Sequence, residues 1–352
     1  MRNPAKRSLS WMKSRDRFLS AMWTNSMISL LTLLLAMVVS AQEPSRLAVN
    51  DKKAPTDEMD LRAISDAIKR VLPSVKSATV CLELGEGSGS GVIVSADGLI
   101  LTAAHVSGGV GKKITAILAD GRKVSCESLG LSSESDCAMA KIIDQGSYPF
   151  VDIDRVDSSK LGDWVFSLGH SGGYDAARGV GVRIGRLVKI ADRTLQSDCT
   201  LIGGDSGGPL FDLNGRLIGI HSRVGENLSV NMHVPMREFL RNWDEMKQSE
   251  FLGNGPFASK PSKGSGFLGL GTEEMAGGGL RVTQIGRESP AEASGIKVGD
   301  MLLKMDDLQI SDKASMQNYL KTKAAGDLVR LVFKRDGKDR EIVLRLAEKS
   351  SP

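Results

Sequence analysis

A serine enclosed by glycines is the residue in this sequence best placed to do chemistry. Ser206 lies in the segment Gly203-Gly204-Asp205-Ser206-Gly207-Gly208-Pro209-Leu210, directly before a predicted strand at 209–213. A serine hydroxyl becomes a good nucleophile only when a base takes its proton. The flanking glycines allow a tight turn and let backbone N–H groups face a developing oxyanion. The segment therefore predicts a nucleophile and, elsewhere in the chain, a histidine and a carboxylate.

The histidine must come from a set of only four, which are His105, His170, His221 and His233. His105 follows a predicted strand at 99–102, and the small residues before it leave room for its ring. The other three are expected to line a pocket or to be structural, because their spacing is not that of metal ligands. We therefore predict His105 as the base and no metal site.

The carboxylate that orients the histidine ring is predicted to be Asp136. It stands at the start of an apolar strand predicted at 137–143. Asp120 and Asp144 are the alternatives, but Asp120 belongs to an Asp-Gly turn and Asp144 lies beyond the strand.

The elements that must position these residues are short strands. Apolar runs predict them at 78–84, 92–94, 99–102, 114–118, 137–143, 164–168 and 217–221. Tight hairpins with two positive φ angles are predicted at Asp97-Gly98, Asp120-Gly121 and Asn214-Gly215. Many short strands with little helix favour a β-barrel or sandwich.

Two helices are predicted around these strands. The first begins at Thr56 or Asp57, ends at Pro73, and has one apolar face made of Leu61, Ile64, Ile68 and Val71. The second runs over 235–247, with Phe239, Leu240 and Trp243 directed inward.

A second compact region follows a segment at 253–266 that is rich in glycine, serine, proline and lysine, as flexible linkers are. Strands are predicted near 280–285, 301–305 and 329–334, with a helix over 313–322 and a hairpin at Asp336-Gly337.

Four segments in the first region together resemble the HtrA/Deg serine proteases, which are chymotrypsin-like double β-barrels. They are 88–94, the Thr-Ala-Ala-His-Val segment at 102–106, 135–142 and 203–210. The order of histidine, aspartate and serine along the chain is also that of the chymotrypsin-like proteases. The resemblance implies that Ser206 is the nucleophile, His105 the general base and acid, and Asp136 the orienting carboxylate. It also implies an oxyanion hole formed by the N–H groups of Gly204 and Ser206, and no metal or organic cofactor.

The sequence departs from the HtrA pattern in ways that resemble trypsin. Asp205 stands where the family usually has asparagine, and Thr-Ala-Ala-His-Val replaces Thr-Asn-x-His-Val. In trypsin the matching aspartate pairs with an N-terminus freed by cleavage, and no Ile-Val-Gly-Gly-like start is present here. The role of Asp205 is therefore open. His221 is a further departure, because the family commonly has asparagine there.

Substrate specificity is predicted from the residue six positions before Ser206. Trypsin has an acid there, whereas this chain has Thr200, which disfavours cleavage after lysine or arginine. We predict a pocket for small or medium aliphatic P1 residues, lined by Thr200, Leu201, Ile202, Ile218, Gly219, Ile220 and His221.

The second compact region resembles an HtrA-type PDZ domain. Its segment 289–302 matches the long Ser-Pro-Ala…Gly-Asp signature, and 266–270 resembles the loop that binds a peptide carboxylate. The resemblance implies that a peptide C-terminus adds to a sheet edge beside Phe267, Leu268, Gly269 and Leu270. The alternative is that these residues form an ordinary apolar strand in a domain used for assembly or gating.

The N-terminal segment predicts export. A basic stretch is followed by an apolar run over 27–39 and by Val39-Ser40-Ala41, which suits signal peptidase. A cleaved signal peptide and an uncleaved membrane anchor both remain open. Residues 1–41 hold six basic residues and one acidic residue, so the rest of the chain is nearly neutral, which does not favour nucleic-acid binding.

The four cysteines, Cys81, Cys126, Cys137 and Cys199, permit disulfides or buried free thiols in an exported protein.

The expected organisation is mainly β, with a double β-barrel protease domain followed by an α+β PDZ domain. We predict a signal peptide or anchor at 1–41, linkers at 42–56 and 249–265, a trypsin-like protease at 57–248 and the PDZ domain at 266–348. The expected function is cleavage of unfolded or damaged envelope proteins, with C-terminal peptides bound at the PDZ domain. The alternatives are a membrane-anchored protease that cuts one signalling substrate and a chaperone or scaffold without proteolysis. The resemblance further implies a homotrimer.

Overall fold

The computed structural model describes residues 46–225 and 229–348. The predicted signal or anchor segment at 1–41 lies outside the described residues. No helix in the described part of the chain is long and apolar enough to cross a membrane.

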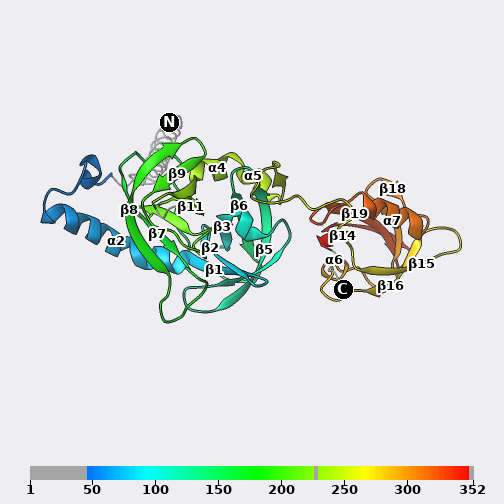
Figure 1. Cartoon of the computed structure of the whole chain (residues 1–352). Coiled ribbons are helices and arrows are strands. Elements are labelled where there is room, and N and C mark those ends of the chain that lie inside the picture. The colour runs from blue at the N-terminus through cyan, green and yellow to red at the C-terminus, as the bar shows by residue number, and fades with distance from the viewer. Residues whose placement is uncertain (1–45, 226–228, 349–352) are drawn as a thin grey trace, which may run out of the picture. The chain divides into compact units, whose positions relative to one another are not determined.

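The first barrel is a sheet in the order β5-β4-β1-β2-β3-β6, which the pairing of β5 with β6 closes (Figure 1). Its strands are β1 (Thr79–Leu84), β2 (Gly87–Ile93), β3 (Leu99–Ala103), β4 (Lys113–Ile117), β5 (Lys123–Ser132) and β6 (Cys137–Ile142). β3 is buried along its whole length, as an apolar strand inside a closed barrel must be.

The second barrel closes in the order β10-β11-β12-β9-β8-β7. Its strands are β7 (Trp164–Gly169), β8 (Gly181–Ala191), β9 (Thr194–Ser197), β10 (Pro209–Asp212), β11 (Leu217–Val224) and β12 (Asn231–Pro235). β3 of the first barrel contacts β11 of the second, and β1 and β2 contact β7. The two closed barrels confirm the predicted double β-barrel.

The first helix is longer than predicted. After the 3₁₀ turn η2 (Ala48–Asp51), helix α2 spans Glu58–Ala78, with Asp57 as the N-cap that accepts from Asp60 N at 3.0 Å. The predicted end at Pro73 is wrong. Pro73 removes one backbone donor, but Val75 and Ala78 beyond it are buried where α2 contacts β1 and β7, and this burial extends the helix. Leu61, predicted on the apolar face, is 57% exposed.

The hairpin turns also differ in detail from the prediction. At Asp97-Gly98, Asp120-Gly121 and Asn214-Gly215 only the glycines take positive φ, at +85°, +85° and +81°. Asp336-Gly337 alone of these pairs has two positive φ angles, 52° and 75°, as its two-residue hairpin requires.

The predicted helix at 235–247 is two short helices, α4 (Met236–Arg241) and α5 (Trp243–Lys247). Asn242 interrupts them, and its side-chain amide donates to Glu238 O at 3.1 Å. Phe239 is fully buried, whereas Leu240 and Trp243 are only partly buried. A short helix, α3 (Ala104–Ser107), follows β3, and β13 (Phe251–Leu252) pairs with β5, so the segment expected as a linker begins beside the first barrel.

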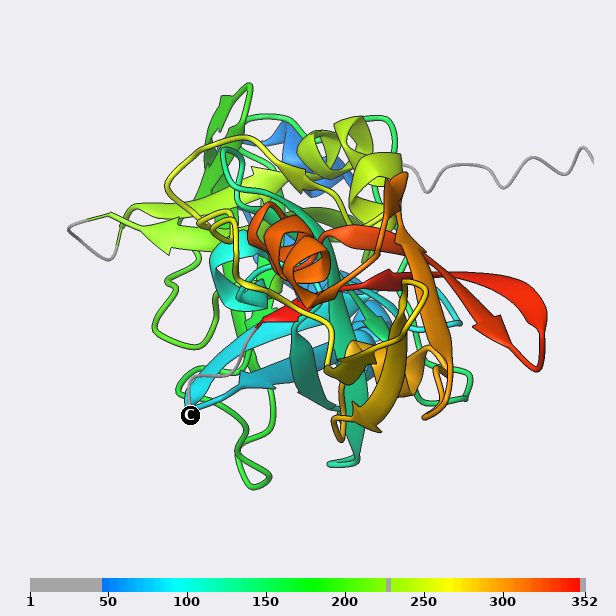
Figure 2. The same cartoon turned by 90° about the vertical axis from the view of Figure 1, so that its right-hand side faces the viewer.

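The C-terminal region has its own sheet, in the order β15-β16-β17-β19-β20, with β18 paired to β17. The elements are β14 (Gly266–Phe267), β15 (Leu270–Glu274), β16 (Leu280–Ile285), α6 (Pro290–Ala293), β17 (Met301–Met305), β18 (Leu308–Gln309), α7 (Lys313–Lys321), β19 (Leu328–Arg335), β20 (Lys338–Arg345) and β21 (Ala347–Glu348). Figure 2 shows β19 and β20 as a long red hairpin. Helix α7 contacts β14 and β15.

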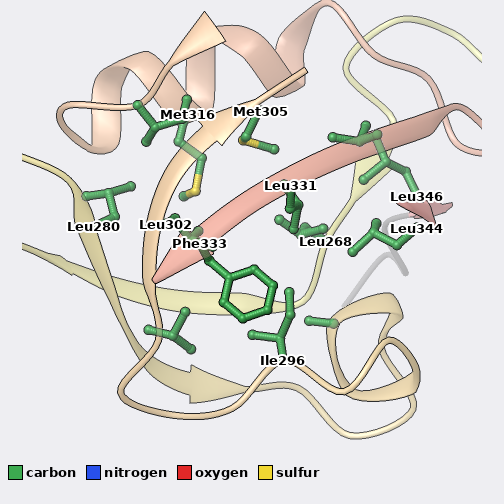
Figure 3. Packing of buried hydrophobic residues seen from close by; sticks show 14 residues of the cluster. Leu268, Leu280, Ile296, Leu302, Met305, Met316, Leu331, Phe333, Leu344 and Leu346 are labelled. Carbon is green, nitrogen blue, oxygen red and sulfur yellow. The ribbon is translucent and has the colours of Figure 1, made fainter. Parts of the chain in front are cut away.

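The core of this region lies between its sheet and its helices. Phe333 is buried among aliphatic side chains that include Leu302, Leu331 and Ile296 (Figure 3). Leu268 belongs to the same cluster and is 3% exposed. This region therefore has a hydrophobic core of its own.

The four cysteines are buried free thiols, so the alternative of a disulfide is not realised. Burial raises the pKa of Cys81 and of Cys199 to about 11 and that of Cys126 to about 12, and it raises the pKa of Cys137 further still. These thiols stay protonated and unreactive near neutral pH.

Candidate active site

His105 and Asp136 meet because β3 and β6 are antiparallel neighbours. Ala103 at the end of β3 pairs with Cys137 at the start of β6, so the residues just beyond these strand ends are brought together. Nδ1 of His105 lies 3.0 Å from both carboxylate oxygens of Asp136, and the backbone N–H of His105 donates to Oδ1 at 3.2 Å. The ring is thereby fixed with Nε2 left for another partner.

Asp136 is fully buried and sits in an unusual backbone conformation. Its φ is +60°, a left-handed value that aspartate tolerates better than most residues. Its carbonyl accepts from Ala104 N at 3.1 Å, which ties the turn to α3. Its Oδ2 also accepts from the buried hydroxyl of Ser222 at 2.5 Å. Both carboxylate oxygens therefore have donors, as a buried charge requires.

Ser206 stands in a turn that packs against the first barrel. Ser90 N, on β2, donates to Ser206 O at 2.8 Å, and Ser90 Oγ donates to Gly204 O at 2.8 Å. Gly207 has φ +83°, and a Cβ there would lie 2.2 Å from Ser90 O and from Thr102 Oγ1. Only glycine fits this close approach, so the glycine after the serine is a requirement of the packing.

Ser206 and His105 line one cavity of about 240 Å³, together with Gly204, Val106, Leu82 and Leu84. Within the described part of the chain, no hydrogen bond joins Ser206 to His105. Such contacts are often long in enzymes without substrate and tighten when substrate binds. The cavity thus brings together the predicted nucleophile and base, next to the buried Asp136.

The predicted oxyanion donors have N–H groups that stay unused in the turn. Gly207 N donates to His221 O, Gly208 N to Asp205 O and Asp205 N to Ile202 O. Among the described residues, neither Gly204 N nor Ser206 N donates to a protein acceptor. Gly204 has φ +93°.

The seven residues predicted to line the specificity pocket are not brought together at this cavity. Ile218 instead packs in the core of the second barrel, with Val165, Leu187, Leu195, Cys199 and Leu210. Ile220 and Leu201 are also buried, Thr200 is partly buried, and Ile202 is 49% exposed. The pocket lining and the aliphatic preference therefore stay predictions.

His221 lies in a buried chain of hydrogen bonds. Its Nε2 lies 3.1 Å from Leu168 O and therefore carries the hydrogen, while its Nδ1 lies 2.9 Å from Nδ1 of His233. A neutral His221 accepts at Nδ1, so His233 donates from its Nδ1 and accepts at Nε2 from Ser197 Oγ, 2.7 Å away. Burial lowers the pKa of His221 to about 3 and that of His233 well below its ordinary value.

The sequence analysis does not predict Ser222 or Arg183 as functional residues. Ser222 directly follows His221 on β11, and Arg183 lies on β8. Neither has a motif around it. A search for a hydroxyl able to reach Asp136 could have suggested Ser222, but only the barrel register places it there.

The predicted peptide-binding segment precedes the edge strand of the C-terminal sheet. β15 is the end strand in the sheet order, and Phe267 before it is 39% exposed. Leu268 is buried in the core, so only its backbone is available to a ligand. Gly269 has φ +82°, and its carbonyl accepts from Gly286 N at 2.9 Å. An edge strand can accept an added strand.

Two parts of the chain match known domain families. Residues 89–220 match the trypsin-like peptidase domain, and residues 266–346 match a PDZ domain. Both domain types are those predicted from the sequence.

Curated relatives are named periplasmic serine endoproteases. The probable periplasmic serine endoprotease DegP-like of Rickettsia conorii is 25% identical over 272 residues, which are 73% of this chain and 53% of that protein. The protein of the same name from Pseudomonas fluorescens is 28% identical over 312 residues, 86% of this chain and 65% of that one. The chain spans little more than half the length of the curated relatives it matches.

Among solved structures, the serine endoprotease from Yersinia pestis is 22% identical with a TM-score of 0.46, covering 84% of this chain and 100% of that one.

Proposed function

We propose that the chain is a serine endopeptidase of the HtrA/Deg type, because it has a trypsin-like peptidase domain followed by one PDZ domain and is similar to proteins named periplasmic serine endoproteases. The observation that carries the proposal is that His105, whose Nδ1 lies 3.0 Å from the buried Asp136 carboxylate, lines one cavity with Ser206. Nδ1 is committed to the carboxylate, so Nε2 is the ring nitrogen left to take the proton of Ser206.

The reaction then proceeds in two halves. Ser206 Oγ attacks the scissile carbonyl while His105 takes its proton, and His105 returns that proton to the leaving amine, so that an acyl-enzyme remains. Water attacks the acyl-enzyme with His105 again as the base, which restores Ser206 and releases the new carboxylate. The N–H groups of Gly204 and Ser206, which have no other acceptor in the described protein, bind the oxyanion of each intermediate. One such donor contributes about 100- to 1000-fold to the rate.

The proposed substrates are unfolded or damaged proteins of the cell envelope. Support comes from the names of the relatives, which are periplasmic endoproteases. The PDZ domain binds exposed C-termini by adding them to the edge strand β15, with the carboxylate held by backbone N–H groups around Gly269. The protein assembles as a trimer in this proposal, which sedimentation would test.

The proposed specificity is for aliphatic P1 residues such as valine and alanine. Thr200 offers no negative charge to a lysine or arginine side chain. A peptide library that shows a basic P1 preference would refute this part alone.

The test compares the wild-type protein with Ser206→Ala and Asp136→Asn on unfolded casein. We expect Ser206→Ala to be inactive and Asp136→Asn to lose about 10⁴-fold in kcat, because an amide no longer stabilises the imidazolium. Equal cleavage by the wild type and Ser206→Ala would refute the nucleophile. Adding peptides with apolar C-termini tests the PDZ role, and activity that ignores them would remove it.

A further inference from the structure

Asp205 is a buried carboxylate inside the turn that carries Ser206. It is 0% exposed and lies against Gly169, where an added Cβ would stand 2.4 Å from Asp205 Oδ1. A charge buried this closely is costly unless it is paired and hydrogen-bonded. The partners of this carboxylate therefore decide what it does.

The cationic partner comes from the neighbouring strand β8. Arg183 Nη2 lies 3.1 Å from Asp205 Oδ2, and the side chains are 24% and 0% exposed. Ser171 completes the contact, because its hydroxyl donates to Asp205 Oδ1 at 2.7 Å and accepts from Arg183 Nη2 at 2.7 Å. The three side chains thus form a closed network in which each carboxylate oxygen is held.

The same carboxylate shapes the backbone before the nucleophile. Ile202 N donates to Asp205 Oδ2 at 2.9 Å, while Asp205 N donates to Ile202 O at 3.1 Å and Gly208 N to Asp205 O at 2.9 Å. Gly204 and Ser206 flank Asp205 directly, so the direction of their N–H groups follows from the position of this residue. The ion pair fixes the carboxylate, and the carboxylate fixes the turn.

We propose that Arg183 is the internal counter-ion that holds Asp205, and through it the Gly204 and Ser206 amides, in the oxyanion-binding arrangement. Trypsin supplies the matching positive charge with a freed N-terminal ammonium, whereas here a strand residue supplies it. Arginine suits the role because it keeps its charge at all accessible pH values, and its Nη2 contacts both Asp205 Oδ2 and Ser171 Oγ. Arg183 acts through Asp205 and is a positioning residue. The inference rests on the proposed function.

The test measures kcat and KM on a fluorogenic peptide with valine at P1, in the full-length protein. Arg183→Met leaves Asp205 buried without its cation, and we expect kcat to fall about 100-fold, the size of a lost oxyanion donor, while KM changes less than threefold. Arg186→Met is the matched control, since Arg186 lies on the same strand but binds Gly162 O at 2.6 Å instead. Its kcat and KM should stay within threefold of the wild type.

A rescue variant separates positioning from general damage. Arg183→Met combined with Asp205→Asn has no buried charge left unpaired, and the HtrA family usually has asparagine at this position. We expect the kcat of this double variant to be at least tenfold higher than that of Arg183→Met. If Arg183→Met does not fold, Arg183→Gln takes its place; it removes the charge but keeps an amide that can donate to Ser171, and its kcat should fall at least tenfold.

Three outcomes decide between the proposals. A folded Arg183→Met variant, or its Gln replacement, with wild-type kcat overturns the role of Arg183, and so does a double variant that recovers nothing. A wild-type protein that leaves both the peptide and unfolded casein uncut refutes the proposed function itself. The two failures are therefore distinguishable.

Discussion

The hydroxyl of Ser222 donates a 2.5 Å hydrogen bond to Oδ2 of Asp136, the carboxylate that also holds His105 Nδ1. The two residues come from different barrels, Ser222 from β11 and Asp136 from the turn before β6. Asp136 therefore receives donors from both barrels, and its position depends on how they pack together.

Removal of the Ser222 hydroxyl should slow the reaction without abolishing it. A hydrogen bond to a charged group contributes about 1.5–3 kcal/mol, but Asp136 keeps two donors from His105. We expect Ser222→Ala to lower kcat about tenfold with an unchanged KM, measured by peptide hydrolysis. Ser222→Thr retains the hydroxyl and should recover part of the loss. An unchanged kcat in Ser222→Ala would show that His105 alone orients the carboxylate.

Gly203 and Gly204 form a matched pair for testing the geometry of the turn. A Cβ on Gly204 would lie 2.5 Å from His170 O with φ at +93°, whereas one on Gly203 meets nothing within 4 Å. We expect Gly204→Ala to lower the free energy of unfolding by at least about 2 kcal/mol, from the left-handed strain and the overlap. Gly203→Ala should change it by less than about 1 kcal/mol. Urea unfolding measures both, and equal losses would contradict the turn geometry.

The sequence predicts the three candidate residues because each carries local signals, and the structure places His105 against Asp136 and in one cavity with Ser206. Ser206 has its glycines, and His105 and Asp136 each adjoin an apolar strand. Ser222 could not be predicted, because the pairing of β11 with β12 shifts register between His221 and Arg223. Such a bulge re-aims a side chain independently of strand alternation.

Other features could not be predicted because they depend on contacts between residues far apart in the sequence. Arg183 on β8 contacts Asp205 only when the second barrel is closed. Helix α2 continues past Pro73 because the burial of Val75 and Ala78 outweighs one missing hydrogen bond.

Stability should fall in acid because of the buried histidines. Burial lowers the folded-state pKa of His170, His221 and His233, while an unfolded histidine titrates near its ordinary value of about 6.5. The unfolded state therefore binds more protons below that pH, and the stability present above about pH 6.5 is lost as pH falls. For His221 the loss continues towards its folded pKa of about 3.

His221→Gln tests this pH dependence. Glutamine offers a donor for Leu168 O and an acceptor for His233 without titrating. We expect the slope of unfolding free energy against pH, between about pH 4 and 6, to fall by up to about 1.4 kcal/mol per pH unit, the value of one proton. Above pH 7.5 His221 should add nothing to the slope of the unfolding free energy against pH, so the wild type and the variant should have the same slope there. A variant slope equal to that of the wild type would mean that His221 is charged in the folded protein.

Gly269 and Gly277 form a matched pair for testing the loop at 266–270 that is predicted to bind a peptide carboxylate. An alanine at either position would have similar backbone strain. Both have positive φ, +82° and +108°, but a Cβ on Gly269 would lie 2.2 Å from Ser289 Cβ, whereas one on Gly277 meets nothing within 4 Å. Ser289 is the N-cap of α6, and its hydroxyl accepts from Glu292 N at 3.3 Å. A methyl group at 269 must therefore displace either the loop or this cap.

We expect Gly269→Ala to weaken the binding of a peptide with a free, apolar C-terminus at least tenfold, because the loop N–H groups no longer point at the carboxylate. Gly277→Ala should bind within twofold of the wild type. Fluorescence anisotropy with a labelled decapeptide measures both, and thermal unfolding checks that the domain remains folded. The amidated peptide is the chemical control, since it lacks the anion that the loop N–H groups would hold. If the amidated and free peptides bind equally well, or if both glycine variants bind like the wild type, the segment 266–270 is an ordinary strand entry and the PDZ domain serves assembly or gating instead.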